Sequence, residues 1–246
     1  MKLLAFESTT SVASVALLDG ARCLASHTVD AGLKHSEILL PMAQEALSHT
    51  KLSFSDIEGY AVAVGPGSFT GVRIGVATVK GLAFGRNLPI VEVSALEALA
   101  YNFLGLDATV IAAMDARRDE IYTAAFRICG DGVTRLCEDR AIPISLLLSE
   151  LRHGGEPVFV VGDAYEKVHR ALTEAEIPVL ITPPTLRAPS AYSVGRCALR
   201  SIENGKTVSD VRLSPSYLRL PQAERERLER LANESNLGKD NNNAKA

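Results

Sequence analysis

Tryptophan, paired cysteines and a dominant charge are missing from this sequence of 246 residues. The four cysteines (Cys23, Cys129, Cys137 and Cys197) form no CxxC pair, which argues against a disulfide framework and against a structural zinc site. The formal net charge is only −3 and the isoelectric point is near 6.0. The composition therefore gives no overall basic surface with which the chain would bind nucleic acid tightly by itself.

Long apolar runs are also missing. The N-terminal stretch MKLLAF is interrupted by Glu7, and it is too short for the core of a signal peptide or for a membrane span. The remaining composition, 47% hydrophobic and 22% charged, is typical of a soluble protein with a sizeable core. We therefore expect a cytoplasmic protein without a membrane segment, built as one large domain or two small ones.

The first half of the chain shows a clear order of apolar segments and turns. Asp19-Gly20 is typical of a hairpin turn, and Pro41 is expected to kink the first helix or to delay its start. Ser94 is a predicted N-cap, with Glu97 completing a capping box. We predict strands at 2–6, 12–18, 22–29, 59–64 and 89–93, and helices at 35–47, 69–85 and 94–100.

The second half repeats this order of strand-strand-strand-helix-strand-helix-strand-helix, with a junction near 104–107. The sequence thus predicts an α/β fold with an N-terminal subdomain at 1–105 and a C-terminal subdomain at 106–220. Residues 221–246 are predicted to form a charged, disordered tail, since they have little apolar surface to bury. In the second half we predict strands at 109–114, 120–128, 132–138, 157–161 and 178–181, and helices at 143–151, 163–172 and 190–203.

Two such copies in succession resemble the superfamily of acetate and sugar kinases, Hsc70 and actin, so the predicted architecture is an actin-like (ASKHA) fold. Within this superfamily the chain resembles the TsaB (YeaZ) family from about residue 2 to residue 220. GPGSFTGVRIG is highly specific to that family, whereas Glu7 is a departure, because many members have aspartate there. The supporting stretches are LLAFESTTSVASVALLDG, GVATVKGLA, AAMDARRDEIYTAAF and SPSYLR.

The resemblance implies a non-catalytic scaffold subunit. Such a subunit would bind TsaD as a heterodimer, with the ATPase TsaE as part of the complex. It would support formation of N6-threonylcarbamoyladenosine next to the anticodon of tRNAs that read codons beginning with A. Contact with tRNA would be indirect, and a homodimer through the same helices stays open for the isolated chain. The alternative is an autonomous small kinase or ATPase of the same superfamily.

Motifs for catalysis, cofactor binding and metal binding are absent from the sequence. The glycine-rich stretch contains no GxxxxGK[ST], and Thr70 stands where GxGxxG requires its third glycine after Gly65 and Gly67. Ser68 lies in GPGSFTG, not in GxSxG. His35 begins HSEILLPM, which is neither HExxH nor the HxxxH through which, by the resemblance, TsaD binds its metal. We predict no catalytic, cofactor or metal residues.

The turns of the superfamily's nucleotide site are only partly retained. Working members have an aspartate followed by glycines in the second half, whereas this chain has Asp115-Ala116-Arg117-Arg118. Hairpin geometry is the favoured interpretation of ESTTS and DARRDE, because Asp and Ser are common in turns. Contact of Arg117 or Arg118 with tRNA phosphates stays open, as does a nucleotide at the partner interface.

The helix at 69–85 is predicted to contact the partner. Gly71 and Gly75 lie one turn apart, as do Gly81 and Gly85. This spacing lets another helix approach closely, and Gly75 is the predicted point of closest approach. Apolar residues surround most of this helix, which predicts either full burial or contact with a partner. The predicted interface, which includes two residues of the helix at 35–49, is Gly71, Val72, Gly75, Val76, Val79, Leu82, Leu39 and Met42.

Overall fold

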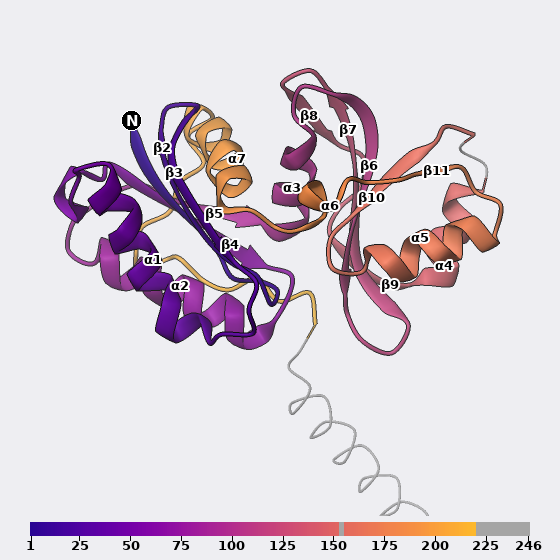
Figure 1. Ribbon diagram of the computed structural model, residues 1–246, viewed down its shortest axis with the longest axis horizontal. Helices are drawn as coiled ribbons and strands as arrows, with labels where there is room; N and C mark the ends of the chain where they lie inside the picture. The colour runs from indigo at the N-terminus through magenta and orange to yellow at the C-terminus, as the bar shows by residue number, and fades with distance from the viewer. Residues whose placement is uncertain (153–154, 220–246) are drawn as a thin grey trace, which may run out of the picture. The chain divides into compact units, whose positions relative to one another are not determined.

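The computed structural model describes residues 1–152 and 155–219 (Figure 1). The predicted tail at 221–246 lies outside the described residues. Met1–Ser216 form one compact unit, which contains two β-sheets and the helices that cover them.

The first sheet has β1 at its centre, in the order β3-β2-β1-β4-β5. β1 is antiparallel to β2 and parallel to β4, and five of its six residues are buried. An apolar run without alternation is what a strand covered on both faces requires. The strands are β1 (Lys2–Glu7), β2 (Ala13–Asp19), β3 (Arg22–Val29), β4 (Gly59–Gly65) and β5 (Ile90–Ser94).

Two helices of the first half begin with a serine cap, of which Ser94 was predicted and Ser68 was not. The Ser68 hydroxyl accepts a hydrogen bond from Gly71 N at 3.2 Å, and Ser94 accepts one from Glu97 N at 3.2 Å. The first helix begins at His35, so Pro41 does not delay its start. The helical elements are α1 (His35–His49), η1 (Phe54–Asp56), α2 (Phe69–Ala83), α3 (Ala95–Ala100) and η2 (Tyr101–Phe103).

The second sheet has the order β11-β10-β6-β7-β8, which repeats the order of the first sheet. One addition was not predicted: the segment at 132–138 stops early, and a further strand, β9, pairs with β7. The strands are β6 (Asp107–Asp115), β7 (Glu120–Cys129), β8 (Gly132–Arg135), β9 (Arg140–Pro143), β10 (Val158–Val161) and β11 (Val179–Leu180). The helices are α4 (Ile144–Leu151), α5 (Tyr165–Glu174), α6 (Pro184–Arg187) and α7 (Ala191–Glu203).

This repetition confirms the predicted actin-like fold. In both halves a central strand is antiparallel to the next strand in sequence and parallel to the strand after the first helix. Figure 1 shows α1 and α2 together on one face of the first sheet and α7 on the opposite face.

The two halves exchange helices. α3 follows the first sheet in sequence but packs on β6 and β7, whereas α7 packs on β1, β2, β4 and β5. A Cβ added to Gly195 of α7 would lie 2.5 Å from the Leu18 side chain, so the helix approaches β2 very closely. α7, predicted within the C-terminal subdomain, therefore completes the core of the first sheet.

The segment after α7 also returns to the first sheet. Val208 exchanges backbone hydrogen bonds with Ile90, and Ser216 N donates to Val64 O at 2.8 Å. Leu213 is fully buried in the core beneath α1 and α2. The SPSYLR stretch thus begins beside the turn that leads into α2.

Candidate functional site

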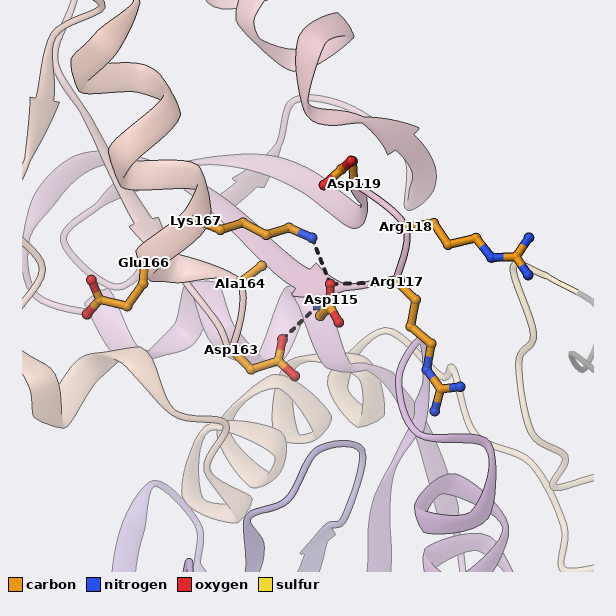
Figure 2. Close-up of a pocket in the computed structure, with 8 residues that line it drawn as sticks. All are labelled: Asp115, Arg117, Arg118, Asp119, Asp163, Ala164, Glu166 and Lys167. Atoms are coloured by element: carbon orange, nitrogen blue, oxygen red, sulfur yellow. Dashed lines mark hydrogen bonds and ion pairs between the residues drawn. The ribbon is translucent and has the colours of Figure 1, made fainter.

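An open hollow of about 700 Å³ lies between the β6–β7 turn and the beginning of α5 (Figure 2). Four of its eight lining residues are acidic and three are basic. They are Asp115, Arg117, Arg118, Asp119, Asp163, Ala164, Glu166 and Lys167.

Several of these charged side chains are engaged in ion pairs or in hydrogen bonds with the backbone. Asp115 Oδ1 accepts from Lys167 Nζ at 2.8 Å, and Asp163 Oδ1 accepts from Asp115 N at 2.8 Å. Glu166 pairs with Arg187 at 2.9 Å. Figure 2 shows Lys167 directed at Asp115, while the side chains of Arg117 and Arg118 extend away from it. The hollow therefore offers a phosphate a nearly balanced, carboxylate-rich surface, and carboxylates repel phosphates.

The β6–β7 turn has a backbone conformation that favours glycine. Arg117, Arg118 and Asp119 have φ angles of 65°, 53° and 59°, in the left-handed region that costs non-glycine residues about 1–2 kcal/mol each. By the resemblance, the superfamily has glycines after the aspartate of this turn. The chain therefore retains a backbone suited to glycine while carrying arginine side chains.

Replacing Arg118 by glycine is expected to raise the free energy of unfolding by about 1 kcal/mol, because glycine adopts φ of 53° without steric cost. Urea denaturation measures the change. Arg118→Ala is the matched control, since it removes the guanidinium and keeps the left-handed strain. Equal gains for both variants would assign the effect to charge instead of backbone conformation.

The β1–β2 turn places a carboxyl group in the interior. Glu7 is fully buried, and its Oε1 accepts from Thr9 N at 2.5 Å and from Thr9 Oγ1 at 2.6 Å. Within residues 1–152 and 155–219, Glu7 Oε2 has no hydrogen-bond partner. Burial raises the pKa of Glu7 to about 7. The hydrogen bonds from Thr9 and from the backbone N–H of Ser8 limit the rise, and the Asp163 carboxylate adds to it.

Asp163 has a perturbed carboxyl group of its own. The residue is exposed, and partial desolvation by the groups around its carboxyl raises its pKa. The backbone N–H of Asp115 acts in the opposite direction. No motif of the sequence indicated that Asp163, 156 residues away, would raise the pKa of Glu7; this effect arises from the fold.

The glycines of the GPGSFTG stretch pack inside this chain, which corrects their predicted role. A Cβ on Gly71 would collide with Ser8 O, and one on Gly75 would lie 2.5 Å from Ser8 Oγ and 3.4 Å from Val62. Gly67 approaches Thr9 O in the same way. The closest neighbour of Gly75 is therefore the β1–β2 turn, so the prediction that a partner helix approaches most closely there is wrong.

The apolar residues of the predicted interface also point inward. Val72, Val76 and Val79 of α2, with Leu39 and Met42 of α1, are buried in the core between these helices and the first sheet. Leu82 is half-buried at the edge of the same core. These side chains hold the two helices on the sheet, and they are not available to form a partner surface.

The exposed residues on these helices and next to their ends are different ones, which we call the α1–α2 face: Leu33, Leu40, Arg73, Ala77, Gly81 and Phe84. All six are exposed, and Phe84, which directly follows α2, is 79% exposed. Ala77 and Gly81 lie one turn apart, and a Cβ on Gly81 would meet no atom within 4 Å. A close-approach spacing therefore does exist on the outer side of α2, two turns after the predicted position.

Among the described residues, no group of three or more histidine, cysteine, aspartate or glutamate side chains is arranged to hold a metal ion. No helix in that part of the chain is both long and apolar enough to span a membrane.

Comparison with known proteins identifies the family. A family model described as "TsaD: tRNA N6-adenosine threonylcarbamoyltransferase" matches residues 29–226. The Bacillus subtilis protein named "tRNA threonylcarbamoyladenosine biosynthesis protein TsaB" is 30% identical over 225 residues, which cover 91% of this chain and 96% of that protein. The chain belongs to the TsaB family.

Further TsaB relatives agree over nearly the full length. The Escherichia coli TsaB protein is 32% identical, with 89% of this chain and 95% of that protein covered. The solved structure of YeaZ from Pseudomonas aeruginosa has a TM-score of 0.72 at 28% identity, and it covers 88% of this chain and 99% of that one. The resemblance seen in GPGSFTGVRIG is therefore confirmed at the level of sequence and of structure.

Proposed function

We propose that this TsaB-family chain is a non-catalytic subunit that binds TsaD and supports formation of N6-threonylcarbamoyladenosine in tRNA in the cytoplasm. The names of its relatives and of the matching family support this reaction. The place of TsaE in the complex, and the position next to the anticodon in tRNAs that read codons beginning with A, follow from the family resemblance.

The chemistry of the chain supports a non-catalytic role. The sequence contains no HxxxH, although the matching family model bears the name of the transferase. In the hollow, Asp115 is paired with Lys167, and Glu166 is paired with Arg187. An autonomous kinase or ATPase would need a surface that attracts phosphates, and this one carries more carboxylates than cations.

The α1–α2 face is the surface that we propose for TsaD, and its composition carries the proposal. Ala77 and Gly81 form an exposed small pair on α2, and Phe84, three residues after Gly81, is exposed as well. Leu40 is an exposed apolar residue of α1. Small residues one turn apart allow a second helix to approach closely, and exposed aromatic side chains are frequent anchors of interfaces. The predicted docking helices are thus retained, with their outward residues as the contacts.

Replacing Gly81 by arginine is expected to weaken TsaD binding about tenfold or more, because the long side chain would occupy the space that the partner helix needs. The stability of the isolated chain should hold, since Gly81 has open space around it. Isothermal titration with TsaD and a thermal melt measure the two quantities.

Thr173→Arg on α5 is the matched control, because it adds the same side chain to an exposed helix position of the second half. TsaD binding should be unchanged in this control. Undiminished binding by Gly81→Arg would refute the proposed docking surface. ATP hydrolysis by the isolated chain, at a rate that TsaD does not alter, would instead support the alternative of an autonomous ATPase.

A further inference from the structure

The β1–β2 turn lies directly under α2. Ser8 O and Ser8 Oγ occupy the space beside Gly71 and Gly75, and Ser8 Oγ donates to Gly71 O at 2.9 Å. At the beginning of the helix, Ser68 N donates to Thr9 O at 2.7 Å. Glycines four residues apart allow this close contact, so any displacement of Ser8 or Thr9 must change how α2 is held.

Glu7 fixes the conformation of this turn. Its Oε1 accepts both the backbone N–H and the hydroxyl hydrogen of Thr9, while Oε2 is buried without a partner in the described part of the chain. Opposite Glu7 on β2 stands Ser14, and the residue after Glu7, Ser8, packs against Gly71 and Gly75 of α2. The Asp163 carboxylate, from the turn before α5, opposes a negative charge on Glu7.

We propose that the Glu7–Thr9 turn holds α2, and thereby the α1–α2 face, in its packed position only while Glu7 is protonated. With a neutral Glu7 carboxyl, the turn stays packed under the helix. When Glu7 loses its proton, its negative charge is fully buried, Oε2 has no hydrogen-bond partner in the described part of the chain, and the Asp163 carboxylate opposes the charge. Moving the turn toward water relieves this charge and withdraws Ser8 from α2. The part of this inference that concerns TsaD rests on the proposed function.

The energetic argument is one of desolvation. An ionised carboxylate that is removed from water is costly unless it is paired, and Glu7 Oε2 has no hydrogen-bond partner in the described part of the chain. Because burial raises the pKa of Glu7 to about 7, the carboxyl changes charge within the physiological range. α2 carries both the contacts to the turn and the exposed Ala77–Gly81 pair, so the same helix connects the two sites.

Hydrogen exchange of α2 tests, in the absence of any partner, whether protonation of Glu7 controls the packing of this helix. We expect the protection factors of the Val72–Val79 amides to fall about fivefold or more between about pH 6 and about pH 8.5 in the unmodified chain. Glu7→Gln, which stays neutral, should keep its protection across this range. Glu138→Gln, which removes an exposed carboxylate of the second half, should behave like the unmodified chain. Equal pH dependence with and without Glu7 would overturn the inference.

A second variant covers the case in which Glu7→Gln does not fold. Asp163→Asn removes the facing charge, and it should reduce the loss of α2 protection at high pH. If Glu7→Gln does not fold and Asp163→Asn loses as much α2 protection at high pH as the unmodified chain, the proposed control of α2 by Glu7 is refuted.

Titration with TsaD at the same two pH values separates this inference from the proposed function. We expect affinity to fall about fivefold or more at the higher pH in the unmodified chain and to change little in Glu7→Gln. No binding at either pH would refute the proposed function and the proposed effect of Glu7 on TsaD binding. Hydrogen exchange would still decide whether Glu7 controls the packing of α2. Binding whose pH dependence survives in Glu7→Gln would overturn only the proposed effect of Glu7 on TsaD binding.

Discussion

Alanine at Gly71 or Gly75 is expected to lower the free energy of unfolding by about 1–3 kcal/mol, whereas alanine at Gly81 should raise it by up to about 1 kcal/mol. The three substitutions are identical and lie on one helix, so helix propensity favours alanine at each. At Gly71 the new methyl group meets the backbone oxygen of Ser8, and at Gly75 it meets Ser8 Oγ. At Gly81 it meets nothing.

Urea denaturation of the three variants measures the difference in sign. Gly71→Ala should be the most damaging, because a backbone oxygen cannot rotate away as a hydroxyl can. If Gly75→Ala instead stabilises the chain as much as Gly81→Ala does, then the turn does not hold α2 as described. The predicted contact of a partner at Gly75 would then be restored.

The fold was predictable because its signals are local. Apolar runs such as KLLAF, turn pairs such as Asp19-Gly20 and N-caps such as Ser94 each indicate an element within a few residues. Their order, repeated twice, was sufficient for the actin-like architecture. The exchange of α3 and α7 between the two sheets was not predicted, because it depends on contacts between segments such as Leu18 and Gly195 that lie far apart in sequence.

The glycine stretch shows where sequence reasoning about a site ends. The spacing of Gly71 and Gly75 correctly indicates a close approach, because a helix interior contains glycine only at a cost. The spacing does not indicate which segment approaches, and the β1–β2 turn at Ser8 is more than sixty residues away. An apolar residue such as Val79 likewise cannot show from sequence whether it faces the chain's own sheet or another protein.

The burial and the raised pKa of Glu7 could likewise not be predicted from the sequence. The stretch ESTTS contains serines, which are common in turns, and the sequence alone favours that interpretation. The burial of Glu7 follows from its place at the end of β1, the central strand of the first sheet, where it lies opposite Ser14 of β2 and just before the turn that packs under α2. The perturbed acidity is thus a property of the tertiary structure.

Glu7→Gln is expected to make the protein increasingly more stable than the unmodified chain as the pH rises. The pKa of Glu7 is 4.5 in the unfolded chain and about 7 in the folded one, so the folded state binds this proton more tightly. The stability contributed by this proton is therefore fully present below about pH 4.5 and is lost as the pH rises through about 7. Each pKa unit corresponds to about 1.4 kcal/mol, so the full loss approaches about 3 kcal/mol.

Urea denaturation between about pH 5 and about pH 8.5 measures this difference, because the groups shared by both proteins cancel when the two profiles are subtracted. The subtracted profile should rise through about pH 7 and then level off, at the pKa of the folded carboxyl. Glu138→Gln, at an exposed position, should give a flat subtracted profile. A flat profile for Glu7→Gln as well would mean that Glu7 ionises at its ordinary pKa in the folded protein. Its carboxyl would then have to be in contact with water, and the closed packing of Ser8 against α2 would not describe the protein in solution.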